Sequence, residues 1–271
     1  MAERDARAGG GELIPRAGIH EAAARGYEAG VEHYRRGRPT YPDDAVSYLM
    51  QQLHIGPAST VLELGAGTGR FTELMVHTGA TITAIEPVAA MREALESACP
   101  TVTALDGTAE EIPIPDGSVD AVVAAQAFHW FDGDRALPEI HRVLRSAGRL
   151  GLIWNVRDET SDWSERLTAI FDRVAGADAP RYRDRAWRRA FERTELFGPL
   201  HRSLAWHAHA VTREGFLDRV LSVSYVASTS PEQRAQVLED VNRLLDSDPE
   251  LAGRDEILMP YRTDVFWCER R

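Results

Sequence analysis

The chain has 271 residues, enough for one α/β domain with additional helices or for two small domains. Its 31 basic residues are all Arg and are outnumbered by 42 acidic ones, which gives a formal net charge of −11. The absence of Lys excludes a Schiff-base lysine, a Walker lysine and a lysine base. The acidic balance argues against a nucleic-acid partner, since phosphate binding needs a basic surface.

Cysteine content and hydropathy set the expected compartment. With only Cys99 and Cys268, a disulfide framework is not expected and a reducing compartment is favoured. No apolar run reaches membrane-spanning length, and the first residues lack the apolar core of a signal peptide. The sequence therefore predicts a cytoplasmic protein without membrane association, and it does not indicate an oligomeric state.

The elements before residue 156 alternate between strand and helix. Residues 1–33 are predicted to form a flexible tail rich in Ala, Gly and Arg, and an amphipathic helix with apolar Ala45 and Leu49 follows Pro42. Strands are then expected near 59–64, 81–86, 101–105, 118–125 and 148–155, with helices near 68–78, 88–97 and 133–145. This alternation predicts a mostly parallel sheet with helices on both faces, and with its loops gathered at the carboxyl edge.

Beyond residue 156 the alternation gives way to a different pattern. We expect a helix near 161–175, a strand near 202–210, helices near 213–222 and 231–246, and a last strand near 257–269. The helices between the final strands are placed where they can fold over the carboxyl edge of the sheet as a cap.

The most informative segment is a glycine-rich turn between a strand and a helix. Gly65, Gly67 and Gly69 allow the backbone to turn sharply and to approach a ligand closely, because no Cβ blocks either. An acid, Glu63, precedes the first glycine, and another, Glu86, ends the next strand, where a carboxylate can accept both hydrogen bonds of a ribose. The pattern favours a nucleoside site at the strand ends.

Two kinds of nucleoside ligand fit this pattern unequally. A dinucleotide-binding loop needs a third glycine where this chain has Arg70, and Glu63 would repel a pyrophosphate. S-adenosylmethionine carries sulfonium and ammonium charges that a carboxylate attracts. Glu86 suits either ligand, so an NAD-dependent oxidoreductase stays as an alternative.

Five motifs together resemble the class I S-adenosylmethionine-dependent methyltransferases of the small-molecule type (methyltransferase type 11), a group that includes trans-aconitate methyltransferase-like proteins. They lie at 63–69, 86–87, 107–113, 120–123 and 126–131, within a resemblance that runs from about Tyr34 to the C-terminus. It implies a Rossmann-like, doubly wound seven-stranded sheet, with an antiparallel last strand between the fifth and sixth, and a helical cap. The methyltransferase domain would span 34–271, with a cofactor-binding core at 56–156, a cap and substrate region largely at 157–256, and the last strand at 257–271.

The resemblance also assigns residues to the cofactor, S-adenosyl-L-methionine. At the position of Thr108 many relatives carry Asp, which accepts from the adenine amino group, so here a hydroxyl or a backbone group must serve. The residues implied are Tyr34, Arg38, Glu63, Gly65, Ala66, Gly67, Gly69, Glu86, Pro87, Met91, Thr108, Ala109, Glu110, Gln126 and Ala127.

The acceptor is expected beside the segment that leaves the fourth strand. His129 is the candidate catalytic residue, as a base or as a donor that orients the acceptor, with simple packing as the alternative. Aromatic walls suit a methyl sulfonium through cation–π attraction. The residues predicted to touch the substrate are His129, Trp130, Phe131, Tyr41, Ser222 and Tyr225.

Two polar clusters leave alternatives open. The Arg-rich segment 181–193 is interleaved with acids, so it is either a surface helix laced with ion pairs or an entry for an anionic substrate. His207 and His209 alternate on a strand without carboxylate or cysteine neighbours at ligand spacing, so no metal site is expected.

The resulting hypothesis is methyl transfer to an oxygen of a small molecule, with a carboxylate preferred. N- or C-methylation of a natural product, and a non-catalytic S-adenosylmethionine-binding protein, are the alternatives. A nucleic-acid methyltransferase is disfavoured by the net charge and by the His129-Trp130-Phe131 segment, which stands where such enzymes carry an Asn-Pro-Pro-aromatic motif.

Overall fold

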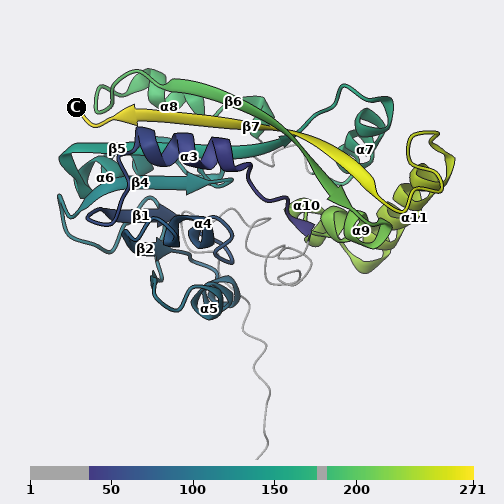
Figure 1. Cartoon of the computed structure of the whole chain (residues 1–271), viewed down its shortest axis with the longest axis horizontal. Helices are drawn as coiled ribbons and strands as arrows, with labels where there is room; N and C mark the ends of the chain where they lie inside the picture. The colour runs from purple at the N-terminus through teal and green to yellow at the C-terminus, as the bar shows by residue number, and fades with distance from the viewer. Residues whose placement is uncertain (1–36, 176–181) are drawn as a thin grey trace, which may run out of the picture.

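A computed structural model describes residues 37–175 and 182–271 of the chain (Figure 1). The predicted N-terminal tail, Tyr34 among the predicted cofactor residues, and Arg181 of the Arg-rich segment lie outside the described residues.

A single seven-stranded sheet in the order β3-β2-β1-β4-β5-β7-β6 organises the molecule. Strands β1 to β5 are parallel, and β7 runs antiparallel between β5 and β6, which confirms the predicted fold class. Because parallel strands buried on both faces need continuous apolar sequence, β1 and β4 are almost entirely buried. The strands are β1 Thr60–Leu64, β2 Thr81–Ile85, β3 Thr103–Leu105, β4 Val119–Ala125, β5 Leu144–Arg157, β6 His201–Val211 and β7 Ile257–Glu269.

Helices cover both faces of this sheet. Residues of α3 (Asp43–Gln52) and α4 (Thr72–Val76) form one core with alternate strand residues such as Val61, and α5 (Ala89–Ala98) packs near them against Ala84. Residues of α6 (Gly133–Val143) and α8 (Arg188–Arg193) form the core of the other face with the remaining strand residues. Because β1 to β5 are parallel, their carboxyl ends meet at one edge of the sheet.

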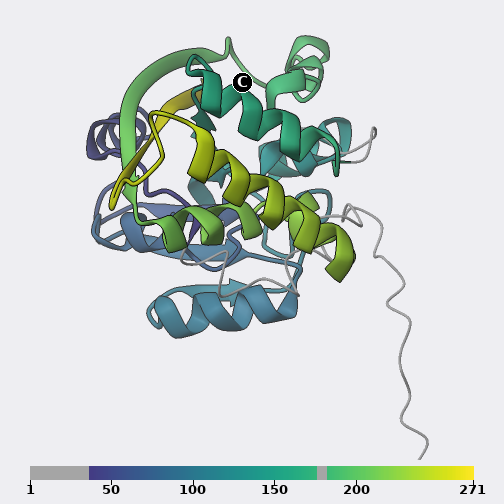
Figure 2. The same ribbon diagram turned by 90° about the vertical axis from the view of Figure 1, so that its right-hand side faces the viewer.

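A cap with its own core lies beyond that edge (Figure 1). It is built on the far ends of β6 and β7 from α7 (Asp162–Asp172), α9 (Arg213–Leu221), α10 (Ser224–Ala227) and α11 (Pro231–Ser247). Figure 2 shows α7 and α11 lying side by side across this end of the molecule. None of the helices in the described ranges is both long and apolar enough to cross a membrane.

Two element boundaries differ from the sequence prediction. The helix after the glycine turn begins at Thr72 rather than near 68, because Gly67 and Gly69 have φ of +59° and +85° and their backbone cannot be helical. The fifth strand begins at Leu144, where the predicted helix 133–145 was expected to continue. The Arg-rich segment contains a short 3₁₀ helix, Tyr182–Asp184, followed by α8.

Candidate active site

The glycine turn is held tightly against the neighbouring strand. The backbone N–H groups of Gly65 and Ala66 both donate to the carbonyl of Ile85, at 2.9 and 3.2 Å. Gly65 has φ of +66°, and a Cβ placed there would lie 2.8 Å from the Cβ of Ala127. The turn therefore needs glycine both for its conformation and for the close approach of the loop after β4.

Glu86 fastens the same turn through both of its carboxylate oxygens. Oε2 accepts the Gly67 N–H at 2.8 Å and Oε1 accepts the Val88 N–H at 2.9 Å. The side chain is only 5% exposed, and burial raises the pKa of Glu86 to about 7 despite these two hydrogen bonds. Each oxygen keeps a free lone pair, so the carboxylate can still accept from the hydroxyl groups of a ligand.

Glu63 is a buried carboxyl group with few partners. It is 1% exposed, and the Thr72 hydroxyl donates to its Oε2 at 2.6 Å. Burial raises the pKa of Glu63 to about 8; the Thr72 hydrogen bond opposes the rise and the charge of Glu86 adds to it. A carboxylate in this position is costly unless a positive charge faces it.

Two cavities lie along the carboxyl edge. The smaller, about 30 Å³, is lined by Glu63, Gly65, Ala66 and other residues of the glycine turn. The larger, about 540 Å³, lies between the sheet edge and the cap. Arg38 and Gln126 line both cavities, so they mark the junction between them.

Both junction residues are fixed by hydrogen bonds. Gln126 has φ of +56°, its backbone N–H donates to Ile153, and its side-chain amide donates to the Asn155 carbonyl at 3.0 Å. Arg38 donates to the Ser222 carbonyl at 3.2 Å, and its own carbonyl accepts from the Arg70 guanidinium at 2.7 Å. The segment around Arg38 thus connects the cap to the glycine turn.

His129 lies in the 3₁₀ helix Phe128–Trp130 and lines the larger cavity. The indole N–H of Trp154 donates to its Nδ1 at 3.2 Å, so the neutral ring carries its proton on Nε2. Burial, together with the charge of Arg38, lowers the pKa of His129 to about 3. The ring is therefore a hydrogen-bond donor at neutral pH and a poor base.

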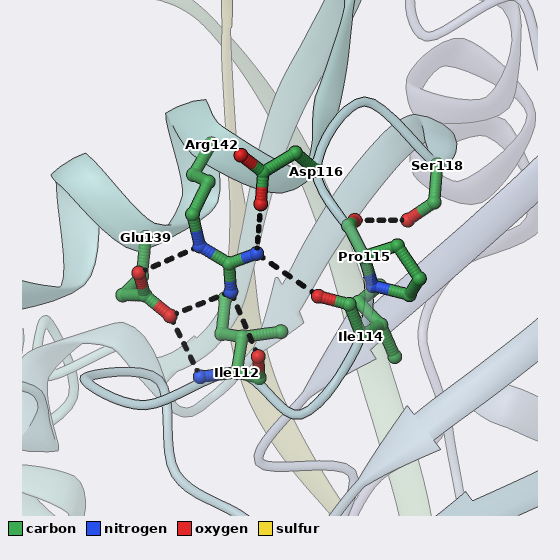
Figure 3. Close-up of polar contacts among 7 residues, drawn as sticks. All are labelled: Ile112, Ile114, Pro115, Asp116, Ser118, Glu139 and Arg142. Carbon is green, nitrogen blue, oxygen red and sulfur yellow. Dashed lines mark hydrogen bonds and ion pairs between the residues drawn. The ribbon is translucent and has the colours of Figure 1, made fainter.

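The loop after β3 is held by a cluster on α6 (Figure 3). Arg142 donates to the carbonyls of Ile112 and Ile114 at 2.8 and 2.9 Å, and forms ion pairs with Glu139 and Asp116. Glu139 in turn accepts the Ile112 N–H at 2.9 Å. This cluster fixes the segment that carries the predicted adenine-side residues.

Those predicted residues occupy different environments. Ala109 and Met91 are buried in cores, and Thr108 forms an isolated bridge with Glu111. Glu110 accepts the Asp132 N–H at 2.8 Å through Oε1, whereas its buried Oε2 has no hydrogen-bond partner among the described residues. Pro87, which follows Glu86, is half-buried.

The residues predicted to touch the substrate do not all line the larger cavity. Trp130 and Tyr225 do so together with His129. Tyr41 lines the smaller cavity instead. A Cβ on Gly65 would lie 3.4 Å from the ring of Phe131, which therefore lies beside the glycine turn. Ser222 is buried, and its hydroxyl and carbonyl bind Arg219 and Arg38.

The Arg-rich segment reaches the larger cavity only in part. Arg183 lines it and is paired with Asp172, while Arg193 pairs with Asp134 on the surface. Sequence reasoning missed several other lining residues, of which Asn155 and Arg157 could have been found as polar residues at the carboxyl end of a buried strand. Other missed lining residues include Phe171, Tyr182, Trp206, Arg219 and Arg262.

Known proteins with similar sequences are named as methyltransferases. A family model described as a methyltransferase domain matches residues 62–152. An uncharacterized methyltransferase of Mycobacterium tuberculosis, Rv3342, is 40% identical over 237 residues, which cover 88% of this chain and 92% of that protein. An uncharacterized methyltransferase-like protein of Schizosaccharomyces pombe, C25B8.10, is 32% identical over 90% of this chain and 95% of its own length.

Solved structures agree on the architecture. A putative type II methyltransferase from Anaeromyxobacter dehalogenans superposes with a TM-score of 0.58 at 23% identity, covering 86% of this chain and 97% of that chain. At this level of identity the similarity shows the fold alone.

Proposed function

Because this chain belongs to the methyltransferase family and uses S-adenosyl-L-methionine as its cofactor, we propose that it methylates an oxygen of a small molecule, preferably a carboxylate. One observation carries the proposal: the larger cavity, which meets the glycine-turn cavity at Arg38 and Gln126, is lined mainly by cations among its charged residues. Its charged lining consists of Arg38, Arg157, Arg183, Arg219 and Arg262 against Asp158 and Glu159. An anionic acceptor suits this lining.

Residues of the glycine turn and of the loops after β2 and β3 fit the cofactor. Glu63 is a buried carboxyl that a cationic ligand would stabilise in its ionised form, and Glu86 offers free lone pairs to ribose hydroxyls. Two buried oxygens in the loops after β1 and β3, Thr68 Oγ1 and Glu110 Oε2, lack hydrogen-bond partners among the described residues. Such atoms are rare in folded proteins unless a ligand or water satisfies them.

The bound cofactor supplies an electrophilic methyl group on a sulfonium. A carboxylate is already a nucleophile near neutral pH, so no base is required. His129 can donate its Nε2–H to the acceptor, and Arg38 at the junction can neutralise the acceptor charge as the two reactants approach. The aromatic ring of Trp130 and the cap exclude water, which strengthens both interactions.

The lowered pKa of His129 separates this proposal from its alternatives. An amine, carbon or phenol acceptor must lose a proton of higher pKa, and His129 with a pKa of about 3 cannot take that proton at neutral pH. A non-catalytic cofactor-binding protein would have no need of a second cavity joined to the first. An NAD-dependent oxidoreductase conflicts with the buried Glu63 at the turn.

Calorimetric titration with S-adenosylhomocysteine, with NAD(H) as the control, tests the cofactor assignment first. A panel of small carboxylic acids, phenols and amines is then incubated with S-adenosylmethionine, and methyl esters are sought by mass spectrometry. We expect micromolar binding of S-adenosylhomocysteine alone and ester formation from acids. Methylation of phenols or amines with no ester would overturn the carboxylate preference, and cofactor binding without turnover of any acceptor would favour the non-catalytic alternative.

A further inference from the structure

Two arginines meet on the cap side of the larger cavity. Arg157 ends β5, and Arg219 comes from α9, far along the chain. The Arg157 side chain is only 10% exposed, lies over the ring of Phe171 at 5.0 Å and donates to the Thr168 hydroxyl. Arg219 donates to the Tyr261 hydroxyl at 2.9 Å and to the Ser222 hydroxyl at 3.2 Å. Their hydrogen-bond partners are therefore neutral.

The ion-pair partner that the described residues offer this pair is one exposed acid, Glu159. The carboxylate of Glu159 is 3.8 Å from Arg157, beyond hydrogen-bonding distance, and it is 44% exposed and also accepts from Thr168. Arg219 forms no ion pair within residues 37–175 and 182–271, and the buried Nε of Arg157 has no hydrogen-bond partner there. Burial lowers the pKa of Arg157, and the charge of Arg219 lowers it further.

Two of the other cavity arginines differ from this pair. Arg262 is paired with Asp264, and Arg183 with Asp172. A buried cation without a partner is costly, whereas one that receives a bidentate anion is stabilised. Of these four arginines, Arg157, with one long ion pair to an exposed acid, and Arg219, with no ion pair in the described ranges, thus have the strongest demand for an anion.

We propose that Arg157 and Arg219 bind a second, non-reacting carboxylate of the acceptor, so that the substrate is a short dicarboxylate. The inference rests on the proposed function, since it takes the first carboxylate as the group that receives the methyl. The two guanidinium groups select for the second charge and orient the acceptor along the cavity.

The backbone sets the spacing between the two ends of such a molecule. Gln126 at the junction donates to the carbonyl of Asn155, and Arg157 lies two residues farther along β5 on the same face. Two strand residues span about 6.6 Å. A dicarboxylate of a few carbons can therefore place one carboxylate beside His129 and Arg38 and the other at Arg157.

Calorimetry on protein saturated with S-adenosylhomocysteine tests this pairing without turnover. The probes are succinate, glutarate and adipate, with butyrate and valerate as singly charged matches. We expect the best dicarboxylate to bind wild-type protein at least tenfold more tightly than either monocarboxylate. Equal affinities, or no binding of any acid, would overturn the inference, and this comparison needs no variant.

Variants of the two arginines then show whether the preference for a dicarboxylate depends on these side chains. Arg157→Gln and Arg219→Gln should each weaken dicarboxylate binding tenfold or more while leaving monocarboxylate binding within about twofold. Arg157→Lys keeps the positive charge but not the two parallel N–H donors of the guanidinium. Its affinity for the dicarboxylate should therefore fall less than that of Arg157→Gln. Arg213→Gln is the matched control, because Arg213 also lies on α9 but pairs with Asp246 and Asn242 on the surface. Thermal unfolding and S-adenosylhomocysteine affinity establish that each variant is folded.

Ester formation separates the failure of this inference from that of the proposed function. Dicarboxylate binding that depends on Arg157 but yields no ester supports the second-carboxylate site and removes carboxylates as methyl acceptors. Equal methylation of mono- and dicarboxylates, unchanged in Arg157→Gln, keeps the proposed function and overturns the second-carboxylate site.

Discussion

The indole N–H of Trp154 donates to Nδ1 of His129 at 3.2 Å, and this contact decides what His129 can do in the reaction. Trp154 is fully buried near the carboxyl end of β5, so the donor is fixed in place. An imidazolium would have an N–H at Nδ1 facing another N–H donor, which opposes protonation in the same direction as burial and Arg38 do.

Variants of His129 should therefore show whether the reaction depends on its N–H hydrogen bond to the acceptor or on its action as a base. His129→Gln, whose amide can supply an N–H near Nε2, is expected to lose less than tenfold in kcat, and His129→Phe about tenfold to a hundredfold, or roughly 1.4–2.7 kcal/mol. At saturating cofactor, kcat of the wild type should show no inflection between pH 6 and 8. A rising limb in that range that disappears in His129→Gln would mean that His129 acts as a base after all.

Glu63 should limit the stability of the ligand-free protein at high pH. Its folded-state pKa is about 8 and its ordinary value 4.5, so its favourable contribution is complete below pH 4.5 and is lost as pH rises through 8. Glu63→Gln removes this loss while keeping an acceptor for Thr72. We expect its melting temperature to exceed that of the wild type at pH 9 by several degrees, at about 2–4 °C per kcal/mol, and to match it near pH 5.

The same variant should bind S-adenosylmethionine at least tenfold more weakly, because the amide no longer faces the cation with a charge. Glu86→Gln is a contrasting case: Gly67 and Val88 both donate to Glu86, and an amide can accept from only one of them. Glu86→Gln should thus lose both stability and affinity. Unchanged affinity in Glu63→Gln would contradict the role given to this carboxylate.

Gly65→Ala should disrupt the turn twice over. The added Cβ meets the Cβ of Ala127 at 2.8 Å, and φ of +66° is unfavourable for alanine. Gly117→Ala is the control, because Gly117 has φ of +56° but open space around it. We expect about 1 kcal/mol of destabilisation at Gly117 from strain alone, and about 2–4 kcal/mol with loss of cofactor binding at Gly65. Chemical denaturation and calorimetry measure the two effects.

Arg142→Gln should loosen the loop after β3 without touching either cavity. Removing its bonds to Ile112 and Ile114 leaves two carbonyls without their donor, at a cost of about 1–3 kcal/mol. Cofactor affinity is expected to fall severalfold. Arg145→Gln, at the start of β5 and paired with Asp120 on the surface, should change stability by less than about 1 kcal/mol. If both variants behave alike, the cluster in Figure 3 does not position the loop.

Residues of the candidate site that lie close together in the sequence could be proposed from it, whereas residues brought together from distant elements could not. Spacing along two consecutive strand–turn units led to the prediction of Glu63, the three glycines and Glu86, and the structure brings them to one edge because the parallel fold gathers consecutive loops there. The Arg157–Arg219 pair depends on how α9 packs over the end of β5, which no short-range pattern encodes. The late start of α4 was missed because left-handed glycines do not alter the apolar periodicity on which the helix prediction relied.

The long strands β5, β7 and β6 run without interruption from the sheet into the cap. The cap helix α7 and the cap helices α9, α10 and α11 thus lie in two connections between the strands of one framework, while the residues predicted to bind the cofactor, up to Ala127, precede both connections in the chain. Under the proposed function, protein engineering for new acceptors should therefore diversify α7 and α9 to α11 while keeping α8, which packs in the sheet core, and Ser222, whose carbonyl holds Arg38.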